Sequence, residues 1–164
     1  MTPKVYEYKN FLKPAECKYF IEKHSQFFNP DNDKRTFYHR ETEIMNIYPF
    51  SNTHTHFTYE SKKLNGRLDF TMKKIDEEVM VNYYQIVRWP KNSFQEKHID
   101  FKDHCYTSII YLNDNFEGGE TVVEKRKIKP KQGLMVLFSG NQTLHSVNKI
   151  KKGNRYTIPC WYTK

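Results

Sequence analysis

The chain is predicted to form a mainly β protein, an antiparallel sandwich or barrel with packing helices near its N-terminus. Three observations predict this class: short runs rich in β-branched and aromatic residues fill the C-terminal half, turn signals separate them, and an amphipathic segment precedes them. At 164 residues, the chain has the length of one domain with a single core. We therefore treat residues 1–164 as one domain.

The N-terminal half predicts two helices separated by loops. Pro14 suits the first turn of a helix, and the residues that share one face at helical spacing are Cys17, Phe20, Ile21, His24 and Phe27. Cys17 and His24 are thereby predicted to be core or boundary residues. Residues 29–56 are polar and turn-rich, so we expect loops with a short strand at "EIMNIY". A second helix is expected within residues 57–80, interrupted near Gly66.

From residue 83 the pattern changes to short strands. The strand-like runs are "YYQIVRW", "YTSIIYLN", "ETVVE", "GLMVLFS", "LHSVN" and "RYTIPCWYT". The segments "NDNFEGGE", "KPKQG" and "KKGN" supply glycine, asparagine and proline where the chain must reverse. Adjacent strands joined by such turns predict antiparallel sheets.

Composition restricts the protein class. The three cysteines are far apart and form no CxxC, which favours a reducing compartment over a disulfide framework. The sequence has no segment typical of a signal peptide or a membrane-spanning helix, so we expect a cytoplasmic protein without a membrane partner. The net charge of +8 invites a nucleic-acid interpretation, but the lysines are scattered over the whole chain rather than clustered. We therefore expect no nucleic-acid partner.

The segment "EKHIDFKDH" carries the first candidate metal ligands. Side chains at positions i and i+2 of an extended segment point to the same side, so His98 and Asp100 can present an imidazole and a carboxylate to one ion. His145 lies in a separate β run more than forty residues later and is the candidate third ligand. Two histidines and one carboxylate are typical of non-haem Fe(II) oxygenases, in which coordination positions stay open.

Arg155 and a rival histidine pair complete the candidate list. An arginine in a buried strand requires an anionic partner, and a dicarboxylate cosubstrate would supply one. His54 and His56 form the rival pair, but the polar residues around them predict an exposed loop with no third ligand nearby.

The ordered motifs are more specific than any one of them. Residues 85–161, about half the chain, resemble the catalytic core of Fe(II)- and 2-oxoglutarate-dependent oxygenases, in particular the prolyl 4-hydroxylase-like branch. The segments that carry this resemblance are "QIVRW", "HID", "TSIIYLN", "GGET", "HSV" and "NRY". Upstream, "FLKPAEC" is similar to the start of the helix that supports the core in this family.

This resemblance implies a fold and a set of roles. The fold would be a double-stranded β-helix, with helical and loop support in residues 1–82 and the catalytic β core in residues 83–164. His98, Asp100 and His145 would hold Fe²⁺ as metal and catalytic residues. Arg155 would bind the distal carboxylate of 2-oxoglutarate, assisted by Tyr111 and Thr121, and ascorbate would act as reductant. Strand parity agrees, because Thr107, Ile109 and Tyr111 share one face, as do Arg155, Thr157, Pro159 and Trp161, whereas Tyr156 and Cys160 face away.

Two positions depart from the family pattern. Trp89 stands where a tyrosine is usual, so it offers the cosubstrate an indole N–H in place of a phenol. His104 stands where many members have an arginine, and it is interpreted equally as a surface histidine or a substrate contact. Trp161 is expected in the core or at the substrate mouth. The retained Asp100 argues against a halogenase, in which a small residue occupies this position.

Several substrates remain open at this level. The resemblance implies hydroxylation of a peptidyl residue, with proline the first candidate and succinate and CO₂ as co-products. A free amino acid or another small molecule is an alternative. Nucleobase demethylation is disfavoured because Trp161 stands where a second arginine would be expected. A catalytically silent binding module is the other class, although none of the expected ligands is lost. The small chain favours a stand-alone bacterial or viral enzyme, and the sequence leaves the oligomeric state open.

Overall fold

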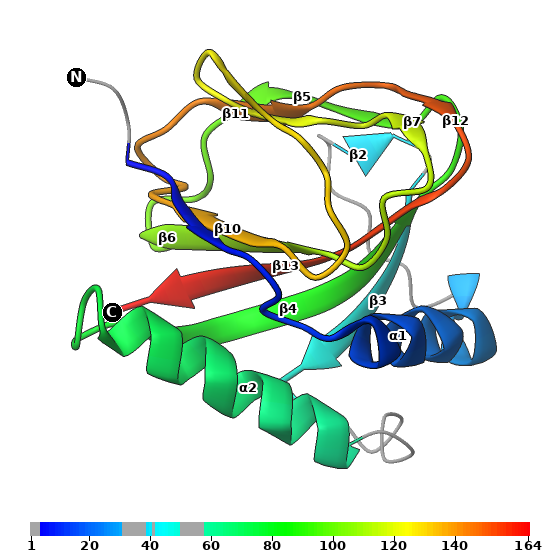
Figure 1. The fold of residues 1–164 in the computed structure, drawn as a ribbon. Helices are drawn as coiled ribbons and strands as arrows, with labels where there is room; N and C mark the ends of the chain where they lie inside the picture. Colours follow the sequence, from blue (N-terminus) through cyan, green and yellow to red (C-terminus); the bar gives the residue numbers. More distant parts are fainter. Residues whose placement is uncertain (1–3, 31–38, 41, 50–57) are drawn as a thin grey trace.

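Two antiparallel β-sheets face each other, and two helices cover the outer face of the larger sheet (Figure 1). The computed structural model describes residues 4–30, 39–40, 42–49 and 58–164. In strand order, the six-stranded sheet contains β1 (Tyr6–Tyr8), β10 (Met135–Phe138), β6 (Tyr106–Tyr111), β13 (Arg155–Thr163), β4 (Met80–Trp89) and β3 (Glu43–Tyr48).

The five-stranded sheet carries the segments on which the candidate ligands lie. Its strand order is β2 (His39–Arg40), β5 (Phe94–His98), β11 (His145–Val147), β8 (Thr121–Val123) and β9 (Arg126–Ile128). A small ribbon pairs β12 (Ile150–Lys152) with β7 (Glu117–Gly118). The facing sheets confirm the predicted double-stranded β-helix class. The short strands β1, β2, β5, β7, β9 and β12 are not among the runs that the sequence predicted.

The first helix, α1 (Pro14–Phe27), forms as predicted. Pro14 occupies its first turn, and the Glu16 carboxylate accepts a hydrogen bond from the backbone N–H of Lys13 at 2.9 Å, which satisfies one donor at the helix start. Its buried residues include Cys17 and His24, as the spacing predicts. The His24 Nε2–H donates to the carbonyl of Glu43 at 3.0 Å, so this histidine joins the helix to β3.

The second helix, α2 (Thr58–Lys73), corrects one expectation. It runs through Gly66 without a break. Leu64, Leu68 and Met72 recur at intervals of four residues and are almost completely buried in the core. Their burial outweighs the roughly 1 kcal/mol that a glycine costs inside a helix.

The core has two layers of apolar packing. The largest cluster lies where the helices pack on the six-stranded sheet, and Tyr156 and Cys160 contribute to it, so they face away from the inter-sheet space as predicted. A second cluster joins Ile109 and Tyr111 of β6 to Val123 of β8 between the two sheets. A third cluster joins Ile44, Val87 and Trp89 of the six-stranded sheet to Val147 and Ile150, so the inter-sheet space is packed there as well.

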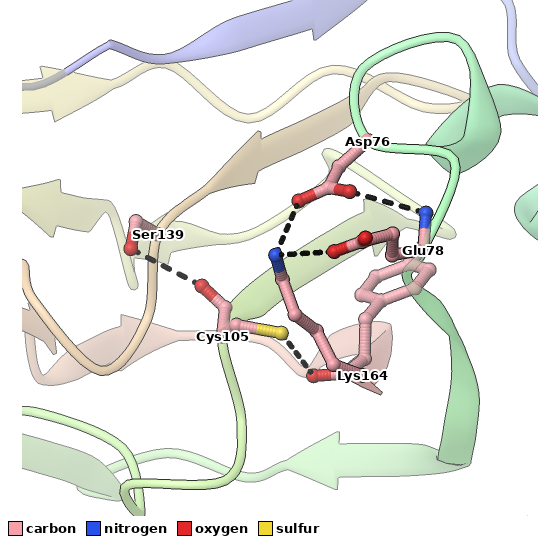
Figure 2. A network of polar contacts seen from close by, with 6 residues as sticks. Asp76, Glu78, Cys105, Ser139 and Lys164 are labelled. Atoms are coloured by element: carbon pink, nitrogen blue, oxygen red, sulfur yellow. Dashed lines mark hydrogen bonds and ion pairs between the residues drawn. The ribbon is translucent and has the colours of Figure 1, made fainter.

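Polar contacts fix the C-terminal end of β13 (Figure 2). The ammonium group of Lys164 lies 3.4 Å from an oxygen of Asp76 and 3.1 Å from an oxygen of Glu78, in the turn between α2 and β4. The Ser139 hydroxyl donates to the carbonyl of Cys105 at 3.1 Å, which ties the loop after β10 to the start of β6. Within the described residues, no helix is both long and apolar enough to cross a bilayer.

Candidate active site

Three candidate ligands converge at the ends of β5 and β11. His98 and His145 are directly paired in the antiparallel register of these strands, and their ring centroids lie 4.2 Å apart. The Asp100 Oδ1 atom lies 3.6 Å from Nε2 of His98 and 3.4 Å from Nε2 of His145. All three ligand atoms lie within 4.8 Å of one another, so one metal ion could contact them together.

The backbone carbonyl two residues before each histidine orients its ring. Nδ1 of His98 lies 2.7 Å from the carbonyl of Glu96, and Nδ1 of His145 lies 2.8 Å from the carbonyl of Thr143. Because a carbonyl only accepts, Nδ1 carries the proton in each ring and Nε2 keeps its lone pair. This tautomer directs both Nε2 atoms toward Asp100, as metal ligation requires.

Asp100 is held as a carboxylate in a tight environment. Burial alone would raise its pKa, but the His145 and His98 imidazoles and the Thr107 hydroxyl beside it hold the pKa well below the usual aspartate range. The Thr107 hydroxyl donates to Oδ2, and the Asp100 backbone N–H donates to the carbonyl of Gly140 at 2.9 Å. A Cβ atom at Gly140 would collide with the Asp100 carboxylate and the Thr107 hydroxyl, so only glycine fits beside this ligand.

Arg155 lies between the two sheets and is the largest fully buried side chain among the described residues. Its Nη2 donates to the Thr121 hydroxyl at 3.0 Å, and that oxygen lies 2.5 Å from the Tyr111 hydroxyl. Its guanidinium carbon lies 4.9 Å from the Trp89 ring centroid and 5.4 Å from that of Tyr111. Burial lowers the pKa of Arg155, an effect that Tyr111 opposes, but an arginine remains charged in proteins.

The Arg155 charge lacks an anionic partner among the described residues. Its Nε atom is buried without a hydrogen-bond partner, and no described carboxylate forms an ion pair with the guanidinium. A buried cation without an anionic partner destabilises the fold unless an anion from outside the chain pairs with it. The arrangement therefore suits a carboxylate-bearing ligand, and the two imidazoles and one carboxylate beside it suit Fe²⁺.

A narrow cavity joins the two halves of this site. Its lining residues are Trp89, Gln95, His98, Asp100, Thr107, Ile109, His145, Val147, Arg155, Thr157, Pro159 and Trp161. The predicted inward faces of β6 and β13 are thus confirmed for Thr107, Ile109 and the four alternating residues that begin at Arg155. The Trp89 indole N–H donates to the Thr157 hydroxyl at 3.3 Å, so it contacts β13 as well as the arginine.

A larger and more open cavity lies elsewhere. It has a volume of about 1080 Å³ and is bordered by β1, the β8–β9 hairpin and the loop 139–143. None of the three candidate ligands lines it. We place the chemistry in the narrow cavity because ligand geometry, rather than size, defines a metal centre.

His104 and Trp161 lie beside the narrow cavity, with ring centroids 6.2 Å apart. Trp161 lines it and stacks on Tyr83, with ring centroids 4.5 Å apart and planes 20° apart. The His104 ring centroid lies 5.4 Å from that of Tyr83, and its Nε2 accepts a hydrogen bond from the side-chain amide N–H of Asn82 at 3.3 Å. His104 is only 8% exposed, so its interpretation as a surface histidine is wrong.

Other sequence-based expectations have different outcomes. His54 and His56 lie outside the described residues. Sequence reasoning missed Gly140 and the Asp100 contact of Thr107. Thr107 reaches Asp100 from β6, whereas Gly140 does so because the loop after β10 folds back against the "HID" segment. The "SGN" turn signal at residues 139–141 marks that loop, but nothing local in the sequence indicates its distant partner.

Comparison with known sequences agrees with this geometry. Residues 81–163 match the family model described as the 2OG-Fe(II) oxygenase superfamily. Human prolyl 3-hydroxylase 2 is 38% identical over 71 residues, which are 38% of this chain and 10% of that protein. The Xenopus tropicalis 2-oxoglutarate and iron-dependent oxygenase domain-containing protein 3 is 34% identical over 83 residues, 44% of this chain and 26% of that protein. The chain thus spans only about a tenth to a quarter of these relatives.

Solved structures show the same fold. The viral collagen prolyl hydroxylase of Paramecium Bursaria Chlorella virus-1, in a 2OG complex, aligns with a TM-score of 0.73 and 21% identity over 96% of this chain and 94% of that chain. HygX from Streptomyces hygroscopicus, with nickel and 2-oxoglutarate bound, has a TM-score of 0.73 and 13% identity, over 99% and 83% of the two chains. With a family model matched over half its length, this chain belongs to the 2OG-Fe(II) oxygenase superfamily.

Proposed function

We propose that this chain hydroxylates a peptidyl residue, with proline the first candidate, and that residues 83–164 form its catalytic β core. One observation carries the proposal. The candidate ligand atoms of His98, Asp100 and His145 lie close together on the cavity that Arg155 also lines, and Arg155 is buried without a described carboxylate partner. When bound, Fe²⁺ with 2-oxoglutarate and dioxygen supplies hydroxylation coupled to decarboxylation, which yields succinate and CO₂.

The residues of this chain bind and orient the reacting groups. His98, Asp100 and His145 would hold the metal from one side and leave the cavity side open. The Glu96 and Thr143 carbonyls set the orientation of the two histidine rings beforehand, so little reorganisation is needed when the metal binds.

Arg155 would bind the distal carboxylate of 2-oxoglutarate in the dry interior. The Thr121 hydroxyl already bridges Arg155 and Tyr111, so a carboxylate placed there meets a charge and two hydroxyl groups. Trp89 packs its ring against the guanidinium and holds it in place. Apolar lining from Ile109 and Val147 would exclude water from the reacting centre.

Relatives support proline as the first candidate. The proteins matched in sequence include prolyl 3-hydroxylases. The solved neighbours include a Trichoplax adhaerens prolyl hydroxylase in complex with a hypoxia inducible factor peptide fragment, with a TM-score of 0.72 and 21% identity over 99% of this chain and 84% of that chain. Trp161 and His104, beside the narrow cavity, would contact the substrate.

The test measures succinate formed from 2-oxoglutarate in the presence of Fe²⁺ and ascorbate as reductant, without and with proline-containing peptides. Wild-type protein should form succinate, and peptide products should gain the mass of one oxygen. The His98→Ala variant is the control. Succinate no greater than in that control would refute the proposed chemistry. Succinate without a hydroxylated peptide would refute the peptidyl substrate.

A further inference from the structure

A buried hydroxyl group faces the narrow cavity beside Arg155. Thr157 lies two residues after Arg155 on β13, so the two side chains share the inner face of the strand, and both line the cavity. Each is only 1% exposed. The wall of the cavity therefore contains two polar side chains from one strand that are almost completely shielded from solvent.

Trp89 determines how the Thr157 hydroxyl is used. Trp89 lies directly opposite Arg155 in the antiparallel β4–β13 register, and its indole N–H donates to Oγ1 of Thr157 at 3.3 Å. An indole nitrogen only donates, so Oγ1 is the acceptor in this bond and its own proton is directed elsewhere. Among the described residues, no acceptor takes that proton.

Two other threonines of the site use their hydroxyl groups differently. The Thr107 hydroxyl donates to the Asp100 carboxylate, and the Thr121 oxygen accepts from Nη2 of Arg155 at 3.0 Å. The Thr157 hydroxyl accepts from an indole and is left with a donor that no described side chain or backbone group meets. A buried donor of this kind destabilises the fold unless a ligand supplies the acceptor.

A second unmet donor lies beside the same indole ring. Nε of Arg155 has no hydrogen-bond partner among the described residues, and the guanidinium carbon lies 4.9 Å from the Trp89 ring centroid. One indole thus packs against the guanidinium and also holds the Thr157 hydroxyl. The two oxygens of a carboxylate can accept from both donors at once, which a neutral single-oxygen acceptor would do less well.

We infer that Thr157 is a further cosubstrate-binding residue, whose hydroxyl donates to the carboxylate of 2-oxoglutarate that Arg155 binds, and that Trp89 is the positioning residue that orients this hydroxyl. The inference rests on the proposed function of Arg155 and deepens it. Arg155 supplies the charge, and Thr157 supplies a neutral donor from the same strand. Trp89 then acts on the cosubstrate through Thr157 as well as by packing against the guanidinium.

Binding of 2-oxoglutarate to the Mn²⁺-loaded protein tests the inference without turnover. The affinity is obtained from the rise in Tm with ligand concentration, relative to the ligand-free Tm of the same variant. Thr157→Val removes the hydroxyl and keeps the side-chain shape, so the affinity should fall about 10–100-fold, as expected for a lost hydrogen bond to a charged group. Thr157→Ser keeps the hydroxyl and should retain most of the affinity.

A matched control makes the same substitution elsewhere. Thr71→Val removes a hydroxyl from α2, on the outer side of the six-stranded sheet, and should leave the affinity for 2-oxoglutarate unchanged. An unchanged affinity in Thr157→Val, or an equal loss in Thr157→Val and Thr157→Ser, would overturn the role of Thr157.

A double-mutant cycle tests the role of Trp89. Trp89→Phe keeps an aromatic ring against Arg155 and removes the N–H, so it should weaken 2-oxoglutarate binding about three- to tenfold when Thr157 is present. In the Thr157→Val background the same change should have no further effect, because the hydroxyl that it orients is gone. An equal loss in both backgrounds would show that Trp89 acts by packing alone and would overturn its positioning role. Succinate formation by the wild type tests the proposed chemistry separately, so failure of the chemistry differs from failure of the Thr157 contact.

Discussion

Replacement of Arg155 by methionine tests the central electrostatic argument. Methionine is unbranched and apolar and fills much of the same volume, so it removes the charge while largely preserving the packing. Without 2-oxoglutarate, the arginine gains about 2–5 kcal/mol from its hydrogen bond to Thr121 and its two ring contacts. Its desolvation costs several kcal/mol, and its Nε has no partner. The two terms nearly cancel.

We therefore expect opposite results with and without the cosubstrate. The Tm of ligand-free Arg155→Met should lie within about 4 °C of the wild-type value or above it, because a difference of about 1 kcal/mol shifts a domain of this size by 2–4 °C. The affinity for 2-oxoglutarate should fall more than about a hundredfold, since a buried charged pair contributes about 3 kcal/mol or more when one partner is removed.

Thermal unfolding of the Mn²⁺-loaded protein over a range of 2-oxoglutarate concentrations measures both quantities. Wild-type Tm should rise with ligand concentration according to the binding equilibrium, and the variant's Tm should not. Mn²⁺ binding by itself should raise the Tm of both proteins. If the variant loses over 10 °C without ligand yet keeps the 2-oxoglutarate effect, Arg155 is structural and the reasoning is wrong.

Three further predictions concern the ligands and the cysteines. Asp100→Ala should abolish both the Tm increase caused by Mn²⁺ and hydroxylation, and a retained increase would exclude Asp100 as a ligand. Gly140→Ala should weaken Mn²⁺ binding about 10–100-fold by displacing the Asp100 carboxylate. Thermal unfolding at increasing Mn²⁺ concentrations would measure this affinity, and an unchanged affinity would contradict the steric argument. Burial raises the pKa of Cys17 to about 11 and raises that of Cys160 further, so both thiols stay protonated at pH 8. Iodoacetamide should therefore modify the half-buried Cys105 first, which mass spectrometry would detect. Equal labelling of all three cysteines would contradict the burial of Cys17 and Cys160.

The sequence predicted the parts of the fold that depend on local periodicity. The residue types in β4, β6, β10 and β13 alternate or run continuously apolar, so these strands were recognisable. The strand β5, "FQEKH", is largely polar and has no apolar alternation, so its strand structure depends on pairing with β11 and β2. Gly66 predicted an interruption of the second helix that does not occur, because the packing of α2 against the core overrides local propensity.

The candidate site was predictable where spacing or parity carried the information. The i, i+2 arrangement of His98 and Asp100, and the common parity of Arg155 and Trp161, follow from extended backbone alone. His104 was ambiguous because its burial depends on Tyr83 and Trp161, which come from other strands. A single sequence does not encode such tertiary neighbours in any local pattern.

The backbone anchors of the two candidate histidine ligands also bear on how this chain can diversify. Each ring is fixed by the carbonyl two positions earlier, at residues 96 and 143, rather than by a side chain. Mutation at those two positions therefore leaves the anchoring acceptor in place. The side chains at residues 96 and 143 can thus change over evolution, or in engineering, while the imidazole tautomers of His98 and His145 stay constant.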